Sequence, residues 1–307
     1  MNIIHSAAEL QTKDKQVCLA IGFFDGVHLG HQQIIRQTIQ HAEQHEALPL
    51  VITFDQHPNV VVAPDRVPPL IYSLEQKLTA ISSMDVETLL LFHFDRAFSE
   101  QPAETFIRSL VRDFGRVQSI SVGTNFLFGY QRRGNLELLK KLGNELHFVV
   151  HGLAAVALDG KPVSSTRIRE TVQSGDLDGA SQMLGRAYSL AGTVMKGDGM
   201  GRQLGFPTAN LNVKGLVLPP KGVYAVHAKV DHKTCRAVVN IGVRPTLGNP
   251  NPEIQVEAHL LDFHGDLYGH FVEIVFVEKM RDEKKFGSLA DLRAQIALDI
   301  REAQLRF

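Results

Sequence analysis

Apolar runs of strand length alternate with helical patterns through the first half of the chain, and this alternation restricts the fold more than any other feature. The strand-like runs are Val17–Ile21, Leu50–Phe54, Thr88–Phe92, Val117–Val122 and His147–Val150. The helical patterns between them are residues 34–42, Ser73–Ser82, Ala103–Phe114 and Asn135–Leu142. This order predicts an α/β fold with a doubly wound parallel sheet. Ligands bind such sheets at the carboxyl ends of the strands.

After Arg186 the pattern changes to short β-rich runs separated by Gly and Pro. These runs are Tyr188–Val194, Gly222–Val230, Arg236–Ile241, Ile254–Asp262 and His270–Phe276. Closely spaced strands of this kind predict an antiparallel barrel or sandwich. The chain then ends in an amphipathic helix with Leu289, Leu292, Ile296 and Ile300 on one face. We therefore expect two domains, 1–185 and 186–307.

The composition is typical of a globular protein without an electrostatic partner. The chain has 307 residues, of which 44% are hydrophobic and 21% charged, and its net charge is −1. Such a balance gives no reason to expect a nucleic acid or a membrane surface as partner. The beginning of the chain lacks a basic region followed by an apolar run, so we expect a cytoplasmic protein. Cys18 and Cys235 lie in apolar runs, and we expect both in the core.

The stretch GFFDGVHLGHQ, Gly22 to Gln32, follows the first strand and opens the first helix. A Gly-rich turn here lets backbone N–H groups approach an anion, and the helix N-terminus adds positive potential. His28 and His31 straddle the helix start, so both imidazoles can donate to phosphate oxygens. The alternative is a plain turn with two surface histidines. The H-x-G-H spacing at a strand-to-helix junction favours the phosphate site.

A second polar stretch, SSTRIR, occupies residues 164–169. Ser165 or Thr166 is suited to cap the helix that follows. Arg167 carries a permanent charge and a planar fork of donors that matches phosphate oxygens. The alternative is an exposed helix start with two solvated arginines, and the stretch taken alone favours that interpretation.

In the second half, residues 197–210 are dense in glycine and end in Pro-Thr-Ala-Asn. The run is no Walker A loop, because no Gly-Lys-Ser/Thr follows the spacer, and it begins no clear helix. On an extended segment Thr208 and Asn210 face the same side. Their neutral oxygens can complete a Mg²⁺ shell together with phosphate and water. A flexible hairpin with a polar tip is the competing interpretation.

Glu257 lies among apolar residues in the run IQVEAHLL, residues 254–261. A carboxylate in such a strand is either exposed at a sheet edge or functional. A desolvated Glu has a raised pKa and can accept a proton from an attacking hydroxyl. The pattern alone favours the sheet edge.

These motifs together resemble a known family. His28–His31 resembles the HxGH signature of the nucleotidylyltransferase superfamily, and the longer string Gly22–Gln32 is similar to bifunctional bacterial riboflavin kinase/FMN adenylyltransferases. The similarity extends in order over nearly the whole chain, through residues 53–58, 122–129, 164–169, 197–210, 240–246 and 281–286.

The resemblance implies that the C-terminal barrel phosphorylates riboflavin to FMN with Mg²⁺ and ATP, and that the N-terminal domain adenylylates FMN to FAD and releases pyrophosphate. The catalytic residues it implies are Glu257, His28, His31 and Arg167. The implied nucleotide contacts are Gly22, Phe24, Gly30, Ser165, Thr166, Gly197, Gly199 and Gly205. The implied flavin contacts are Asn125, Phe128 and Arg281, and the implied Mg²⁺ ligands are Thr208 and Asn210. Riboflavin, FMN and ATP are the implied partners, without nucleic acid or membrane, and the sequence does not predict the oligomeric state.

Three positions depart from the family pattern in the adenylyltransferase half. Gln56, Asn125 and Leu127 stand where the family usually has Pro, Asp and often Arg. Two alternatives therefore stay open. One is a riboflavin kinase with a weak or altered nucleotidylyltransferase domain, and the other is an inactive flavin sensor.

Overall fold

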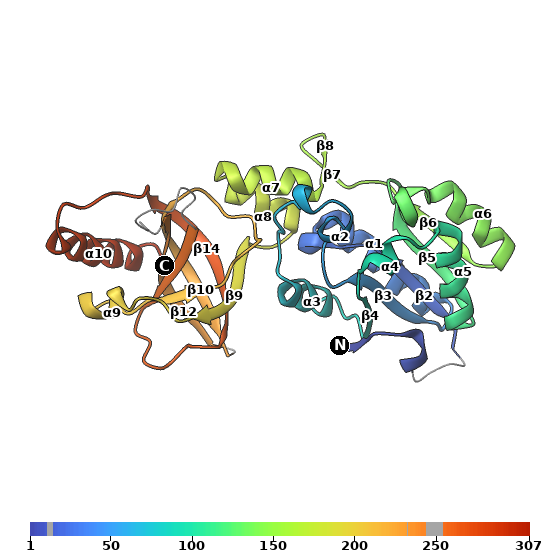
Figure 1. Cartoon of the computed structure of the whole chain (residues 1–307), viewed down its shortest axis with the longest axis horizontal. Coiled ribbons are helices and arrows are strands. Elements are labelled where there is room, and N and C mark those ends of the chain that lie inside the picture. Colours follow the sequence, from blue (N-terminus) through green and yellow to red (C-terminus); the bar gives the residue numbers. More distant parts are fainter. Residues whose placement is uncertain (11–14, 232, 244–253) are drawn as a thin grey trace. The chain divides into compact units, whose positions relative to one another are not determined.

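The computed structural model describes residues 1–10, 15–231, 233–243 and 254–307. The described chain forms two compact units (Figure 1). The first contains Met1–Leu70 and Leu74–Arg167, and the second contains Ile71–Ser73 and Ile168–Phe307. The domain boundary expected near residue 185 remains a prediction.

The first unit is built on a six-stranded sheet in the order β1-β4-β3-β2-β5-β6. Its strands are β1 (Asn2–Ile4), β2 (Val17–Ile21), β3 (Leu48–Phe54), β4 (Thr88–Phe92), β5 (Val117–Gly123) and β6 (Val149–Leu153). Every neighbouring pair is parallel, which confirms the predicted parallel sheet. The short edge strand β1 was not predicted, because three residues carry no periodicity.

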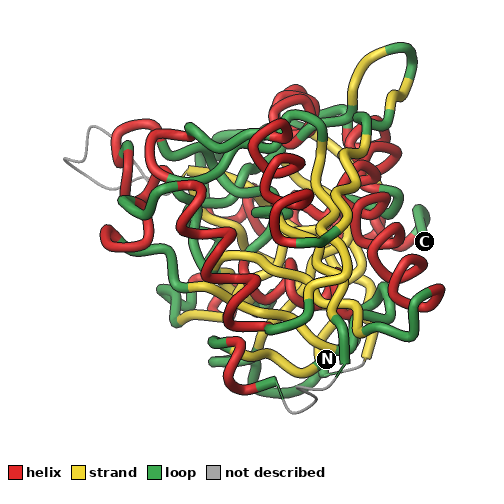
Figure 2. The backbone as a smooth tube through the Cα atoms, turned by 90° about the vertical axis from the view of Figure 1, so that its right-hand side faces the viewer, coloured by secondary structure: helices red, strands yellow, loops and turns green. Residues whose placement is uncertain are grey.

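Helices cover both faces of this sheet (Figure 2). They are α1 (Leu29–Gln44), α2 (Asn59–Val62), α3 (Leu74–Ser82), α4 (Arg96–Ser99), α5 (Ala103–Phe114) and α6 (Leu136–Leu146), with short 3₁₀ turns η1 (Ala7–Glu9), η2 (Asp25–Val27), η3 (Pro64–Arg66) and η4 (Tyr130–Arg132). Alternate residues of β2 enter different cores. Leu19 and Ile21 pack with side chains of α5 and α6, whereas Ala20 packs with those of α1 and α3. A strand buried on both sides reads as a continuous apolar run.

The strand order reverses direction at β2. From β2 the chain runs outward through β3 to β4 and then returns to place β5 on the other side of β2. A crevice forms outside the carboxyl ends of the strands at such a reversal, and ligands bind there. The loop that carries His28 follows β2, and the loop that carries Asn125 follows β5. These two loops are therefore neighbours at the edge where a ligand is expected.

The second unit contains a closed six-stranded barrel in the order β10-β13-β12-β11-β14-β9. Its strands are β9 (Ser189–Met195), β10 (Ala209–Leu211), β11 (Gly222–Val230), β12 (Lys233–Val243), β13 (Ile254–Leu260) and β14 (Phe271–Arg281). Each pair is antiparallel. Of the two predicted alternatives, barrel or sandwich, the barrel is confirmed.

Side chains alternate between the inside and the outside of the barrel wall. Val256, Ala258 and Leu260 of β13 are buried, whereas Glu257 and His259 between them are not. Because side chains of a strand point alternately to opposite faces, Glu257 lies on the outer face of the wall. This position is neither the barrel core nor a free sheet edge.

The remaining elements lie before the barrel strands in the sequence, between them or after them. They are α7 (Ser165–Ser174), the hairpin β7 (Ala157–Leu158) and β8 (Lys161–Pro162), α8 (Leu177–Leu184), α9 (Met200–Leu204) and α10 (Leu289–Gln304). The short helix α9 lies inside the Gly-rich run, where we had expected no helix. Leu289 of α10 is 64% exposed, so this residue does not share the buried face that the spacing suggested.

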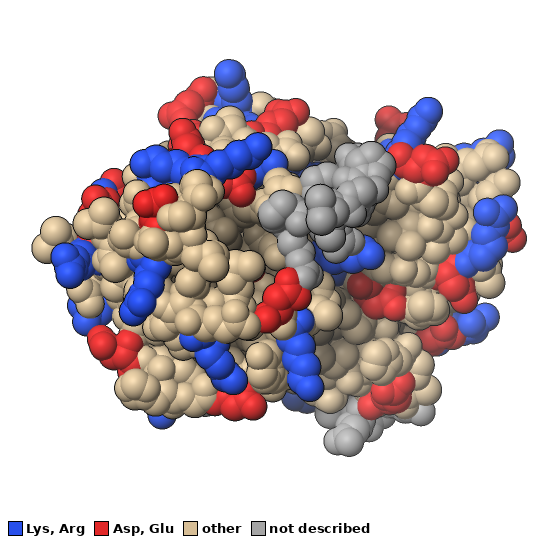
Figure 3. Space-filling model, turned by 60° about the vertical axis from the view of Figure 1, so that its left-hand side comes forward, with Lys and Arg blue, Asp and Glu red and all other residues tan. Residues whose placement is uncertain are grey.

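Two other expectations need correction. The strand expected at His147 begins at Val149, because His147 takes a left-handed φ of 63° and ends α6. Cys18 is buried as expected, but Cys235 is only half-buried. No helix in the described part of the chain combines the length and apolar character needed to cross a bilayer. Basic and acidic side chains are interspersed on the face shown in Figure 3.

Candidate active sites

The loop between β2 and α1 has an unusual backbone. Phe24 and Val27 take left-handed φ angles of 54° and 42°, and Gly26 between them has a φ of 74°. Such angles are uncommon outside glycine, cost on the order of 1–3 kcal/mol per residue, and persist only where the surroundings hold them. The strained loop therefore marks a site that its surroundings hold in one shape.

His28 and His31 lie together at the N-terminus of α1. His28 is the N-cap, and its Nδ1 accepts a hydrogen bond from the backbone N–H of His31 at 3.4 Å. The two rings stack, with centroids 3.6 Å apart and planes inclined by 19°. Because Nδ1 of His28 is an acceptor within the helix, the proton of the neutral ring is on Nε2.

Gly22 and Gly30 leave room for these rings. A Cβ atom at Gly30 would lie 3.2 Å from Cε1 of His28, and one at Gly22 would lie 2.8 Å from Cε1 of Phe24. The Phe24 ring is 1% exposed and lies edge-on to His31, with centroids 5.3 Å apart. Phe24 was expected to contact the nucleotide. Its ring packs against His31, and the expected nucleotide contact stays a prediction.

The start of α7 is joined to the same loop. Ser165 Oγ donates to the backbone carbonyl of Asp25 at 3.2 Å. The cap of α7 is Ser164, whose Oγ accepts from the backbone N–H of Arg167 at 3.2 Å. The expectation that Ser165 or Thr166 caps this helix was therefore wrong. Thr166 is exposed. Two motifs more than a hundred residues apart in sequence thus meet beside α1.

Arg167 is engaged with the β7–β8 hairpin. Its Nη1 donates to the backbone carbonyls of Leu158 and Lys161, both at 3.0 Å. These bonds fix the guanidinium close to the first turn of α7. The structure therefore shows the Arg167 side chain as an anchor of the hairpin, two residues after the Ser165 contact with the loop of His28.

The loop after β5 places the two expected flavin contacts differently. Asn125 is exposed in a turn next to the loop after β2. Phe128 is 7% exposed, and its ring stacks on Phe126 with centroids 5.2 Å apart and lies 6.3 Å from the Phe106 ring. Asn125 is accessible to a ligand, whereas Phe128 is a core side chain that holds this loop in place.

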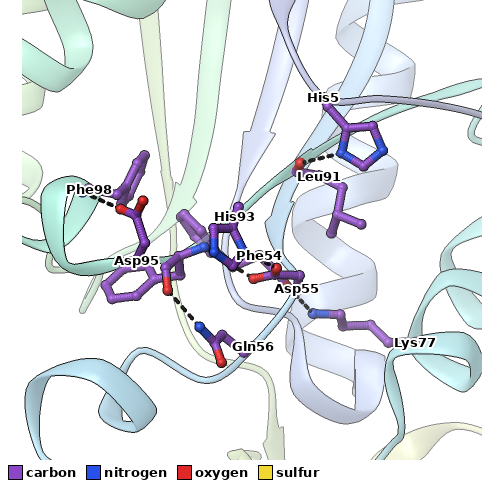
Figure 4. Close-up of polar contacts among 10 residues, drawn as sticks. His5, Phe54, Asp55, Gln56, Lys77, Leu91, His93, Asp95 and Phe98 are labelled. Atoms are coloured by element: carbon purple, nitrogen blue, oxygen red, sulfur yellow. Dashed lines mark hydrogen bonds and ion pairs between the residues drawn. The ribbon is translucent and has the colours of Figure 1, made fainter.

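The end of β3 carries a compact polar cluster (Figure 4). Asp55 binds Nδ1 of His93 at 2.5 Å and accepts from the backbone N–H of Phe94 at 3.1 Å. Burial opposes ionisation of Asp55, but the contacts with His93 and with the backbone N–H of Phe94 together outweigh burial and lower the pKa of the carboxyl. The hydrogen bond with Asp55 raises the pKa of His93. Gln56, a departure from the family pattern, donates to the carbonyl of Phe94 at 2.8 Å and so helps to fix this loop.

Lys77 of α3 reaches the same edge of the sheet and was not predicted from sequence. Its Nζ donates to the carbonyls of Phe54 at 2.6 Å and Phe23 at 3.3 Å. The side chain is 4% exposed within an otherwise apolar face of α3. A lysine at an apolar position of a helical pattern was the one signal that could have identified it.

The second unit contains a cavity of about 320 Å³ on the outer face of the barrel. Its lining includes most of the residues expected for this half of the chain, namely Gly197, Gly199, Thr208, Asn210, Glu257 and Arg281. Gly205 is not part of the lining. It ends α9 with a left-handed φ of 90°, a conformation that favours glycine, and its nucleotide contact stays a prediction.

Three polar side chains form a row across neighbouring strands in this cavity. Glu257 of β13 is opposite Asn210 of β10 on one side and opposite Asn240 of β12 on the other. Residues directly opposite in an antiparallel pair have Cβ atoms about 4.5–5.5 Å apart and point to the same face. The carboxylate is therefore flanked by two amides. Asn240 had no role in the sequence interpretation.

The Gly-rich segment passes close over the same row. A Cβ atom at Gly197 would lie 2.2 Å from Nδ2 of Asn210, and one at Gly201 would lie 3.0 Å from Oγ1 of Thr208. Any larger residue at Gly197 would displace the amide. The glycines thus bring the backbone against Thr208 and Asn210, which both line this cavity.

Arg281 closes another side of the cavity through a buried ion pair. Its Nε and Nη2 bind Oδ1 and Oδ2 of Asp299 at 2.8 and 2.7 Å. The side chains are 16% and 5% exposed, and Gln295 adds a bond to Asp299 Oδ1 at 3.0 Å. Arg281 was expected as a flavin contact or a solvated helix start. It is a cavity residue whose charge is neutralised by α10.

The apolar stripe of α10 forms part of the cavity wall. Leu292, Ile296 and Ile300 all line it. Val223 and Val238 of the barrel are also in the lining. One cavity therefore combines an apolar wall with a row of polar groups, as sites for amphipathic small molecules do.

Comparison with known proteins assigns the two parts of the chain to two different enzyme families. Residues 10–167 match the profile of the FAD synthetase family, and residues 184–307 match that of the riboflavin kinase family. The chain is 37% identical to the bifunctional riboflavin kinase/FMN adenylyltransferase of Haemophilus influenzae over 291 residues, with 94% of each chain covered. It is 37% identical to that of Escherichia coli K12, covering 97% and 96%, and 34% identical to that of Bacillus subtilis, covering 99% and 96%.

A solved structure has the same fold over nearly all of the chain. It is a crystal structure described as a macrolide-efflux protein from Streptococcus pneumoniae, with 27% identity, a TM-score of 0.81 and 98% of both chains covered. The fold and the two family matches define an ATP-using transferase with two enzyme domains in one chain. The chain belongs to the bifunctional riboflavin kinase/FMN adenylyltransferase family, with an FAD synthetase domain followed by a riboflavin kinase domain.

Proposed function

We propose that the barrel cavity converts riboflavin to FMN and that the site at the end of the parallel sheet converts FMN to FAD, with ATP as co-substrate of both reactions. The observation that carries the proposal is the row of Asn210, Glu257 and Asn240 facing a cavity with an apolar wall. A sensor that only binds a flavin has no use for a carboxylate placed between two amides.

In the kinase reaction Glu257 accepts the proton of the riboflavin 5′-hydroxyl. The hydroxyl oxygen forms a bond to the γ-phosphorus of ATP, and the bond from that phosphorus to ADP breaks. A base must lie within hydrogen-bond reach of the proton that it takes. Glu257 projects from the middle of β13 into the cavity, so a substrate in the cavity is within its reach. Most of the remaining catalysis is positioning and charge stabilisation.

Thr208 and Asn210 would hold Mg²⁺ with the phosphates of ATP. Both supply hard, neutral oxygen atoms to the same cavity, which fits the ligand preference of Mg²⁺. The described residues contain no group of three or more His, Cys, Asp or Glu side chains able to hold a metal ion. A metal held by two side chains and substrate phosphates needs no such cage. When bound, Mg²⁺ would neutralise charge that develops on the phosphates.

The apolar wall of the cavity suits the flavin ring. Leu292, Ile296 and Ile300 of α10 would contact the ring, and the ion pair of Arg281 with Asp299 would keep this helix against the barrel. Gly197 and Gly199 would let the backbone approach the ATP phosphates. In this arrangement Arg281 acts on the flavin chiefly through the position of α10.

In the adenylyltransferase reaction a phosphate oxygen of FMN attacks the α-phosphorus of ATP and pyrophosphate leaves. His28 and His31 would donate to oxygens of the α-phosphate as charge develops there. Ser165, Thr166 and Arg167 would contact the phosphates from the start of α7. Backbone N–H groups of the loop after β2, with Gly22 and Gly30 making room, would add neutral donors.

Asn125 would contact FMN from the loop after β5, and Phe128 would support that loop from the core. We place the enzyme in the cytoplasm, where riboflavin and ATP are both available, and propose neither a nucleic acid nor a membrane as partner.

The direct test is a steady-state assay with riboflavin, ATP and Mg²⁺ in which FMN and FAD are resolved chromatographically. We expect FMN to appear first and FAD to follow. Conversion to FMN alone, with supplied FMN left unchanged, would reduce the first unit to an altered nucleotidylyltransferase. Binding of riboflavin without either product would make the protein a flavin sensor.

A further inference from the structure

A buried ammonium group lies beneath the loop that carries His28. Lys77 of α3 is 4% exposed, and its Nζ donates to the carbonyl of Phe54 at 2.6 Å (Figure 4) and to that of Phe23 at 3.3 Å. Nζ also lies 4.4 Å from the centroid of the Phe23 ring. Burying an ammonium group is costly, so it occurs where the charge is paired or bonded.

The two carbonyls belong to different strand ends. Phe54 is the last residue of β3, and Phe23 lies in the loop after β2, two strands that pair in parallel. Thr53 Oγ1 also donates to the Phe23 carbonyl, at 3.0 Å. One carbonyl at the root of the loop thus accepts two donors. The left-handed residues Phe24 and Val27 follow directly, so this anchor adjoins the strained part of the backbone.

Nearby carboxylates offset only part of the effect of burial on the pKa of Lys77. Burial lowers the pKa of Lys77 to about 8, and the carboxylates of Asp25 in η2 and Asp55 after β3 favour the charged form. Asp55 is itself bound to His93. His57 also contacts the Phe23 ring, edge-on and with centroids 5.0 Å apart.

We propose that Lys77 is a positioning residue for adenylyl transfer. Its protonated side chain holds the Phe23 carbonyl against the end of β3 and thereby keeps the loop in the shape in which His28 and His31 meet the ATP phosphates. The proposal rests on the adenylyltransferase function of this unit. A neutral amine loses the charge that strengthens both carbonyl contacts and the contact with the Phe23 ring.

The consequence is a pH dependence confined to one of the two reactions. The protonated form is the active one, so FAD formation is intact below the pKa of Lys77 and is lost as the pH rises through about 8. The value of kcat/KM for ATP reports groups of the free enzyme. Riboflavin phosphorylation, measured on the same chain with the same Mg²⁺ and ATP, controls for titration of the substrates.

The experiment compares full-length wild type, Lys77→Arg and Lys77→Met, with Lys140→Met, exposed on α6, as the matched control. Arginine stays charged throughout this range. We expect wild-type kcat/KM for FAD formation to fall about tenfold per pH unit above about 8, and Lys77→Arg to retain its activity there. Lys77→Met should lose about 10 to 10² fold at pH 7.5, as small misplacements of catalytic groups do. Its kinase activity should stay within about twofold of wild type, as should both activities of Lys140→Met.

Three results would overturn the proposal. The first is a wild-type FAD profile that is flat to about pH 9.5 or parallel to the kinase profile. The second is a fall above pH 8 that persists in Lys77→Arg. The third is a Lys77→Met protein with normal FAD formation. The wild-type and arginine profiles decide the matter even if Lys77→Met does not fold. A wild type that makes FMN but no FAD would instead refute the adenylyltransferase function, and the proposal with it.

Discussion

Glu257 faces Asn210 across the β10–β13 pair, at the point where the barrel wall meets the Gly-rich segment. The same register places Asn240 on the other side of the carboxylate. The proposed base and the proposed metal-binding amide are thus held by backbone pairing of three strands. Strand residues are held more precisely than loop residues, which suits a reaction whose catalysis is mostly positioning.

Replacing the carboxylate should stop the kinase alone. Glu257→Gln keeps the shape of the side chain and removes the base, so FMN formation should fall by about 10² to 10⁴ fold. FAD formation from supplied FMN should remain near wild type. Glu273→Gln makes the same chemical change on β14, outside the cavity lining, and should leave both rates unchanged. Near-normal turnover of riboflavin by Glu257→Gln would show that this carboxylate is structural.

The Arg281–Asp299 pair should be cooperative in stability. Removing one partner of a buried pair leaves an uncompensated charge and costs about 3–5 kcal/mol, whereas replacing both costs far less. We expect Arg281→Met and Asp299→Leu each to speed hydrogen exchange of β14 amides strongly, and the double variant to recover most of the protection. Lys279→Met, which breaks the exposed pair with Asp282, should change little. If the double variant instead loses as much protection as the two single variants added together, the two side chains act independently.

A fragment that begins at residue 168 should be a better kinase domain than one that begins at 186. The second unit includes α8, whose Ala180, Met183 and Leu184 are fully or almost fully buried. Ser181 Oγ also accepts from the backbone N–H of Tyr188 at the start of the barrel. Burial of a Met or Leu side chain contributes roughly 1.5–3 kcal/mol. We expect both fragments to make FMN and no FAD, and fragment 168–307 to have the higher urea midpoint. Equal midpoints would place the domain boundary near 185.

Acid should weaken the first unit through histidines between α1 and β6. The rings of His41 and His151 have centroids 4.5 Å apart, as do those of His41 and His45. Burial lowers the pKa of both His41 and His151, and neighbouring imidazoles lower that of His41 further. A depressed pKa means that the folded state binds fewer protons than the unfolded state, so stability is present above about pH 6.5 and is lost as the pH falls.

The measurement is the thermal midpoint for unfolding of the first unit, taken between about pH 7.5 and 5.5. His41→Gln and His151→Gln should each flatten its fall. His270→Gln, which changes an exposed histidine of the second unit paired with Asp231, should not. A slope that is the same in all four proteins would place the titrating groups elsewhere.

The sequence was most informative where structure is local. Period and run length identified β2, β4, α5 and β11 to within a residue or two, because buried strands and amphipathic helices carry their own patterns. The pattern alone favoured a phosphate site at His28 and His31, whereas most other site residues were assigned a role only through the resemblance. Gly-rich runs and lone polar residues have several uses, and the pattern alone placed Glu257 at a sheet edge.

The contacts that a pattern could not reveal are all long-range. The bond from Ser165 to Asp25, the pairing of Arg281 with Asp299 and the reach of Lys77 to Phe23 depend on how elements pack. The motifs also did not reveal that the rings of Phe24 and Phe128 are almost fully buried, because a motif contains residues that shape a site as well as residues that touch a ligand; their ligand contacts stay predictions.

The central claim is that one chain holds two independent active sites, and complementation between two defective chains tests it most directly. His31→Ala should lose about 10² to 10³ fold in FAD formation, since a donor aimed at developing charge contributes ~3 kcal/mol, and should stop at FMN when given riboflavin. His28→Ala should behave in the same way. Glu257→Gln should leave riboflavin unchanged but convert supplied FMN. Mixed in equal amounts with riboflavin, ATP and Mg²⁺, His31→Ala and Glu257→Gln should together make FAD at a rate set by release of FMN. A mixture that makes no FAD although each protein performs its remaining reaction, or a single substitution that abolishes both reactions, would contradict the account.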